Sequence, residues 1–86
     1  MSEYGKYGKN RVELELRFTY HKPFGNQTER YTDLRDSAHD FADLLDAFVP
    51  ESREKALAFT KLEECVMWAN AGIARRENEE DDHGTV

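Results

Sequence analysis

The segment KLEECVMWANAGIARRE, residues 61–77, carries apolar side chains on two opposite faces of one helix. With about 3.6 residues per turn, one apolar stripe consists of Leu62, Val66, Ala69 and Ile73. That stripe suits packing against one neighbouring helix. Trp68, the single tryptophan, falls on the opposite side, at helical steps from Leu57, Lys61, Glu64, Ala71 and Arg75. One neighbouring helix therefore cannot cover all of this segment, and its second face must meet water or other chains.

A second helical pattern precedes this segment. Its apolar stripe consists of Tyr31, Leu34, Ala38, Phe41, Leu45 and Phe48, and its polar back carries Asp33, Asp36, Asp40 and Asp43. Pro50 disfavours helix at the residue before it, so the pattern stops there and a new helix begins near Ser52 and continues to about Arg76. Such a short connection makes the two helices antiparallel neighbours. The sequence thus predicts a mainly α fold built on a two-helix hairpin.

Residues 11–20, RVELELRFTY, alternate between apolar and polar side chains. A period of two predicts one half-buried β-strand, and nothing else in the chain has strand character. A lone strand leaves backbone donors and acceptors unpaired along both edges. We therefore expect this N-terminal strand to pair with the same strand of another subunit, which makes the protein a homo-oligomer.

The composition divides the chain into one domain and two terminal segments. A chain of 86 residues buries only about 60% of the surface that its unfolded form exposes, so partner chains would help to stabilise it. We expect residues 1–10 to be a flexible N-terminus and residues 11–77 to form the strand and hairpin domain. Residues 78–86 are expected to be a disordered acidic tail, because they are polar and contain no aromatic residue.

Charge and cysteine content restrict the partners and the compartment. The net charge is −6, and five of the acidic residues lie in residues 77–86, which leaves −1 for the rest. No excess of Lys and Arg is available for DNA, for an RNA polymer or for an anionic membrane, although small anions are not excluded. The polar N-terminus and the absence of any long apolar run predict no signal peptide and no membrane span. The lone Cys65 excludes an internal disulfide, so we expect a cytoplasmic protein, with this thiol buried beside the apolar stripe.

Aromatic and cationic residues cluster around the end of the predicted strand and the first helical turns. They are Tyr20, His21, Arg30, Tyr31 and Arg35. Aromatic faces beside guanidinium groups suit a flat base and its phosphates. The alternative is structural, with Tyr31 in the core and Arg35 paired with an aspartate. Because the three histidines are scattered and no Gly-rich phosphate loop occurs, we expect no metal, no cofactor and no catalytic centre.

The side of the second helix that carries Trp68, which we call the Trp68 face, has two interpretations. In the first, Trp68, Leu57 and Ala71 form a subunit interface and nothing more. In the second, the same interface contains a pocket, because the face also carries charged residues, namely Arg53, Lys61, Glu64 and Arg75. Salt bridges between subunits would equally satisfy these charges.

Several segments of the chain resemble a family of small phage proteins. The most specific are Ser52-Arg53-Glu54-Lys55, residues 60–64 (TKLEE) and residues 67–70 (MWAN), with FTYHKP and Arg30-Tyr31 less specific. They are similar to the hairpin-domain sponges that blunt the bacterial CBASS and Thoeris defences by sequestering cyclic nucleotide signals. The resemblance covers about residues 11–77, and the chain departs from the pattern at Lys22, Phe59 and Cys65.

The resemblance implies a helical hairpin that assembles into dimers or hexamers and captures cyclic nucleotides at subunit boundaries without chemistry. Carried over by position, Tyr20 stacks on a base and Arg35 contacts a phosphate, while Asn70 and Lys61 reach the ligand from the second helix. Arg53 and Arg75 are further candidates beside Arg30 and Tyr31. Trp68, Leu57, Glu64 and Ala71 would form the oligomer interface. The ligand class is a cyclic dinucleotide, a cyclic trinucleotide or a cyclic ADP-ribose isomer.

Two other functions remain open at this point. The protein could be a small oligomeric inhibitor module that uses its acidic helix back or its strand edge to occlude a host protein. It could also be an enzyme that degrades cyclic nucleotides, although the carboxylates lie on solvated faces without the desolvation that acid–base chemistry needs.

Overall fold

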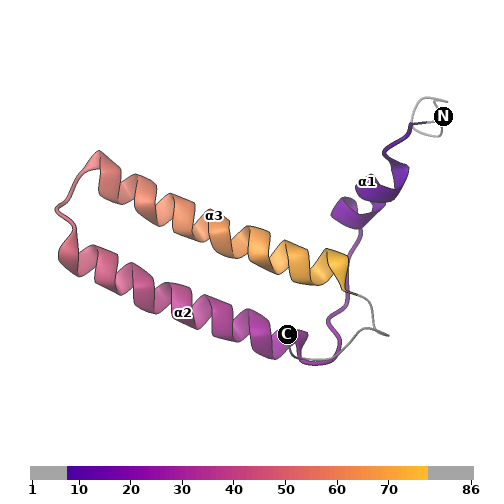
Figure 1. Cartoon of the computed structure of the whole chain (residues 1–86), viewed down its shortest axis with the longest axis horizontal. Coiled ribbons are helices and arrows are strands. Elements are labelled where there is room, and N and C mark those ends of the chain that lie inside the picture. Colours follow the sequence, from indigo (N-terminus) through magenta and orange to yellow (C-terminus); the bar gives the residue numbers. More distant parts are fainter. Residues whose placement is uncertain (1–7, 78–86) are drawn as a thin grey trace.

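The computed structural model describes residues 8–77, which form three helices: α1 (Arg11–Phe18), α2 (Gln27–Phe48) and α3 (Arg53–Arg76). Helices α2 and α3 run antiparallel and side by side as a hairpin (Figure 1). The short helix α1 projects away from the hairpin near the C-terminal end of α3 (Figure 1). The predicted αα-hairpin is therefore confirmed.

Polar contacts fasten the closed end of the hairpin. Ser52 occupies the N-cap of α3, and its Oγ accepts a hydrogen bond from the backbone N–H of Lys55 (3.1 Å). The side chain of Lys55 is only 5% exposed, and its Nζ lies 2.9 Å from a carboxylate oxygen of Asp46 and 2.9 Å from one of Glu51. These partners raise the pKa of Lys55, Asp46 more than Glu51. A charged ammonium thus ties the end of α2 to the loop and to the start of α3.

A second polar cluster fastens the open end. Gln27 is 1% exposed, and its Nε2 donates to the carbonyl oxygen of Ile73 (3.2 Å) and to Oε1 of Glu77 (3.0 Å). Arg30 forms a forked ion pair with the Glu77 carboxylate, with distances of 2.9 and 2.7 Å. Arg30 also donates to Oδ1 of Asn26 (2.9 Å), and the side chain of Asn26 makes no capping hydrogen bond to α2. The open-end cluster joins the first turn of α2 to the last turn of α3.

The hairpin has no enclosed apolar core. Within residues 8–77 no apolar side chain is fully buried, and the stripe residues Leu45, Leu62, Val66 and Ile73 are half-buried where α2 meets α3. Phe41 and Phe48 of the predicted stripe are exposed. Trp68 remains 63% exposed. Two helices alone cover one side of each other, so most of the large apolar side chains stay in contact with solvent.

The predicted N-terminal strand is wrong, because residues 11–18 form α1. A helix satisfies its backbone hydrogen bonds within the segment, whereas a strand needs a neighbour that a single chain does not supply. Glu13 pairs with Arg17 one turn later (2.9 Å) and with Arg76 of α3 (2.9 Å), and both contacts support the helix. They also lower the pKa of Glu13, Arg76 having the larger effect.

Three further expectations concern the surface and the ends. Cys65 is an exposed free thiol, so its predicted burial is wrong. The acidic tail, residues 78–86, and most of the predicted flexible N-terminus lie outside the described residues. Within the part that the structure describes, no helix is long and apolar enough to cross a membrane.

Candidate functional site

A groove of about 620 Å³ lies at the open end of the hairpin. The end of α1 and the connection after it form one wall, and the first turns of α2 and the last turns of α3 form the others. The groove is lined by Arg17, Thr19, Tyr20, His21, Tyr31, Arg35, Met67, Asn70, Ala71, Ala74 and Arg75. We refer to it below as the Tyr20 groove.

The groove brings together five of the eight ligand residues predicted from the sequence. They are Tyr20, Tyr31, Arg35, Asn70 and Arg75. Tyr31 and Arg35 stand one turn apart on α2 and so share a face, while Asn70 and Arg75 come from α3. Residues far apart in the sequence therefore converge on one concave surface.

Tyr20 stands on the connection between α1 and α2 and is 82% exposed. The neighbouring His21 donates from its ring Nε2 to the carbonyl oxygen of Leu16 (2.6 Å), because a carbonyl can only accept. This bond folds the connection back against the end of α1. The ring of Tyr20 is thus exposed, while the backbone beside it is held in place by the His21 hydrogen bond. This arrangement suits stacking on a flat ligand.

The Tyr20 groove is cationic although the chain is acidic. Three guanidinium groups line it, those of Arg17, Arg35 and Arg75, and none of its lining residues is an aspartate or a glutamate. Arg17 pairs with Glu13, whereas Arg35 and Arg75 form no ion pair with any residue from 8 to 77. Arg35 has one long contact, 3.4 Å to the hydroxyl of Thr32. Two guanidinium groups are thus available for an anion.

Two polar groups of the groove are affected by burial, the amide oxygen of Asn70 and the phenol of Tyr31. The Oδ1 atom of Asn70 is buried and has no hydrogen-bond partner, a costly state that a donor from outside the chain would relieve. Burial raises the pKa of Tyr31, and the nearby Glu77 carboxylate adds to this effect. Tyr31 therefore stays a neutral phenol that can donate a hydrogen bond.

Three predicted ligand residues lie outside the groove. Arg30 is held in the open-end cluster by Glu77. Lys61 is exposed and pairs with Glu64 at 3.3 Å, and Arg53 is the first residue of α3, at the other end of the hairpin. The structure does not bring these three side chains to the other five.

Four lining residues of the groove are not among the residues predicted from the sequence, namely Arg17, Thr19, Met67 and Ala74. Arg17 was missed because the predicted strand placed it on the face opposite Tyr20. His21 stood in the aromatic and cationic cluster but was not selected as a ligand residue. If residues 11–18 are taken as a helix, Arg17 no longer has to point away from Tyr20, and it can lie beside α3.

The predicted interface residues lie on an open surface. Trp68 donates from Nε1 to a carboxylate oxygen of Glu64 (3.3 Å), which leaves its ring largely uncovered. That bond and the contact with Lys61 lower the pKa of Glu64. Leu57 is exposed as well, and Ala71 is half-buried in the wall of the Tyr20 groove.

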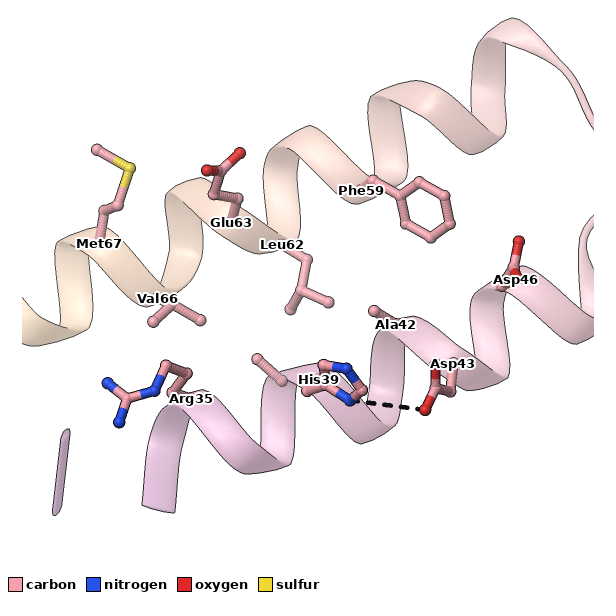
Figure 2. A pocket seen from close by; sticks show the side chains of 11 residues that line it. Arg35, His39, Ala42, Asp43, Asp46, Phe59, Leu62, Glu63, Val66 and Met67 are labelled. Atoms are coloured by element: carbon pink, nitrogen blue, oxygen red, sulfur yellow. Dashed lines mark ion pairs between the residues drawn. The ribbon is translucent and has the colours of Figure 1, made fainter. Parts of the chain in front are cut away.

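A second groove, about 680 Å³, runs between α2 and α3 and shares Arg35 and Met67 with the first. Leu62 and Val66 point from α3 toward α2 in its floor (Figure 2). Its rim carries three acids, Asp43, Asp46 and Glu63, which repel an anion. His39, Asp40 and Asp43 bring their ligand atoms within 4.8 Å of one another, but all three are exposed. This groove is thus better suited to apolar contact than to phosphate.

Comparison of the sequence with known protein families identifies the family of this chain. A family model, the Acb2/Tad1 hairpin domain, matches residues 11–74. That range includes α1, α2 and all of α3 but its last two residues, and it contains every lining residue of the Tyr20 groove except Arg75. Comparison with curated proteins and with solved structures gives no match. Because the family model covers most of the chain, this protein belongs to the Acb2/Tad1 hairpin-domain family of anti-CBASS and anti-Thoeris sponges.

Proposed function

We propose that this protein is a phage anti-defence sponge that binds cyclic nucleotide immune signals and releases them intact. The signals are cyclic dinucleotides, cyclic trinucleotides or cyclic ADP-ribose isomers. One observation carries the proposal: the Tyr20 groove combines three arginines and two tyrosines with no carboxylate among its lining residues. Family membership supports it independently.

The groove offers a partner for each part of such a ligand. Arg35 and Arg75 supply forked N–H donors that match phosphate oxygens. Tyr20 supplies a ring for base stacking. The buried Oδ1 of Asn70 accepts from an N–H donor, such as the exocyclic amine of a base.

We propose that the protein acts by mass action and not by catalysis. General acid–base chemistry needs a positioned pair of groups, and the lining residues of the groove include one imidazole, that of His21, and no carboxylate. Its Nε2 already contacts the carbonyl oxygen of Leu16. In this proposal the protein works as a homo-oligomer in the host cytosol, where it must bind the signal more tightly than the defence effector does. Trp68, Leu57, Glu64 and Ala71 form its subunit interface.

The test is a thermal-shift screen of the full chain against the three classes of cyclic nucleotide. At a thousandfold excess over the dissociation constant, a ligand stabilises the folded state by about 4 kcal/mol. In a domain of this size each kcal/mol raises Tm by about 4–8 °C. Ligand recovered after heat denaturation should be chemically intact. A degraded ligand would identify an enzyme, and no shift with any class would refute the sponge.

A second candidate is an inhibitor module that occludes a host protein. The observation in its favour is the row of exposed acids on the back of α2, Asp33, Asp36 and Asp40. Replacing all three by asparagine should leave a sponge fully active against the defence. Loss of anti-defence activity without any nucleotide binding would favour the inhibitor.

A further inference from the structure

One wall of the Tyr20 groove has little helix packing to hold it. Of the helices that the structure describes, only α2 and α3 pack extensively against each other, and α1 projects away from the hairpin (Figure 1). Tyr20 stands on the connection that follows α1. The ion pair between Glu13 and Arg76 links α1 to α3, but both side chains are partly exposed, and such pairs contribute little to stability. Other contacts must therefore set the place of Tyr20 against α2 and α3.

The far end of the connection is bound by a single residue, Gln27. Its backbone N–H donates to the carbonyl oxygen of Phe24 (3.0 Å), and its side-chain Oε1 accepts from the backbone N–H of Phe24 (3.1 Å). A glutamine that reaches back three residues to a backbone N–H is one half of a capping box. Between the two residues Gly25 has a φ angle of 56°, in the left-handed region that favours glycine. Gln27 thus binds both main-chain polar groups of Phe24 and closes a tight turn.

The same side chain reaches α3. Its Nε2 donates to the carbonyl oxygen of Ile73 (3.2 Å) and to Oε1 of Glu77 (3.0 Å). The amide of Gln27 therefore joins the connection, the first turn of α2 and the last turn of α3, and these three segments form the walls of the Tyr20 groove. Gln27 itself is 1% exposed and is not a lining residue.

We propose that Gln27 is a positioning residue of the ligand site. It does not touch the ligand, but it holds the connection so that the ring of Tyr20 lines the same groove as Arg35 and Asn70. A connection that is ordered before binding loses less conformational entropy when the ligand binds. The inference rests on the proposed function, because it concerns the same groove, and it names Tyr20 as the group through which Gln27 acts.

The contacts of Gln27 require an amide. A carboxamide has two N–H donors and an acceptor oxygen, and both ends of the group are used here. Gln27→Glu would keep the shape and the acceptor, but it would place oxygen beside the Ile73 carbonyl and the Glu77 carboxylate. Gln27→Met would keep the unbranched shape and remove both donors and the oxygen. Both changes should release the connection from α3.

Order parameters from nuclear magnetic resonance of the full chain without ligand test the placement. The backbone amides of residues 19–22 should have values near about 0.85 in the natural chain, as in rigid backbone, and below about 0.6 in Gln27→Met and Gln27→Glu. Lys55→Met is the matched control, because Lys55 is also a buried polar side chain, bound at the closed end of the hairpin. It should lower Tm without changing these order parameters. Circular dichroism should show that all three variants keep their helices.

Ligand affinity tests the route through Tyr20. The probe is the cyclic nucleotide that raises Tm most in the thermal-shift screen, and calorimetry is done at a temperature where every variant is folded. Gln27→Met should bind it about tenfold more weakly than the natural chain, which corresponds to roughly 1.4 kcal/mol, and Lys55→Met within about twofold. In a Tyr20→Ala background, Gln27→Met should cause almost no further loss, because the ring that it positions is absent. A merely structural defect would cost the same factor in both backgrounds.

The outcomes separate this inference from the proposed function. Unchanged order parameters in Gln27→Met would overturn the inference, as would an affinity within about twofold of the natural chain. An equal loss of affinity with and without the Tyr20 ring would also overturn it. A natural chain that binds none of the cyclic nucleotides would refute the sponge, and the order parameters would then decide whether Gln27 holds the connection.

Discussion

Replacing Arg35 by alanine should separate ligand binding from folding. In the free protein the Arg35 side chain is exposed, forms no ion pair within residues 8–77 and has only the 3.4 Å contact with Thr32. Surface substitutions of this kind change the free energy of unfolding by no more than about 0.5 kcal/mol. The unliganded Tm of Arg35→Ala should therefore stay close to that of the natural chain.

Ligand binding should respond much more strongly. A hydrogen bond between a guanidinium and a phosphate contributes about 1.5–3 kcal/mol, so the dissociation constant of the cyclic nucleotide should rise roughly 10- to 150-fold. Titration calorimetry with the ligand identified in the screen measures this change directly. The ligand-induced rise in Tm should shrink in parallel, by about 4–8 °C for each kcal/mol lost.

Arg53→Ala is the matched control, since Arg53 is an exposed arginine at the opposite end of the hairpin. It should bind ligand as the natural chain does. An affinity of Arg35→Ala within about twofold of the natural value would show that Arg35 does not contact the phosphate, because such a change is worth only about 0.4 kcal/mol. Equal losses in both arginine variants would mean that long-range charge, and not the groove, attracts the ligand.

Three further changes test other parts of the structure. Tyr20→Ala should lose about 1–3 kcal/mol of stacking and weaken ligand binding in calorimetry, whereas Tyr20→Phe should retain it; equal binding by both would remove the stacking role. Asn70→Leu removes a buried oxygen without a partner, so it should maintain or raise Tm while weakening binding by about 1 kcal/mol, and a lower Tm would contradict this account. Lys55→Met should lower Tm at neutral pH, because Asp46 and Glu51 raise the pKa of Lys55 above its ordinary value of 10.5. A group whose pKa is raised on folding stabilises the fold fully below its ordinary pKa and ceases to do so as the pH rises through the folded-state pKa. From neutral pH upward, the Tm difference between Lys55→Met and the natural chain should therefore stay constant until it shrinks in this alkaline range.

The hairpin was predictable because its signals are local. Helical spacing in residues 28–48 and 53–76, Pro50 after the first helix and Ser52 at the N-cap of the second all act within a few residues. The prediction failed for residues 11–18, where the apolar alternation is a genuine strand pattern. Arg76, more than sixty positions away, pairs with Glu13 there, and no local pattern contains such a contact.

The site was predictable in part for a related reason. Tyr31 and Arg35 share a face by helical spacing alone, and Tyr20 lies close to them in the sequence. Arg17 could not be placed without knowing that α1 is a helix near α3. Arg30 belongs to the predicted aromatic and cationic cluster, but a forked pair with Glu77 holds it away from the groove. Only the fold shows which of the two adjacent residues, Arg30 or Tyr31, lines the groove.

The distribution of polar contacts explains how so small a chain presents a defined groove without an enclosed core. Lys55 fastens the closed end of the hairpin, and Gln27 with Arg30 and Glu77 fastens the open end. Hydrogen bonds and forked ion pairs are directional, so they fix the register of α2 against α3 more narrowly than apolar contact does. The open-end cluster includes Arg30, the residue before Tyr31, so it also fixes one wall of the Tyr20 groove. A groove that is already ordered loses less entropy when it binds, and a sponge that competes with an effector by affinity gains from this. Because these contacts at the two ends are polar, the exposed apolar surfaces remain free for the binding that we propose.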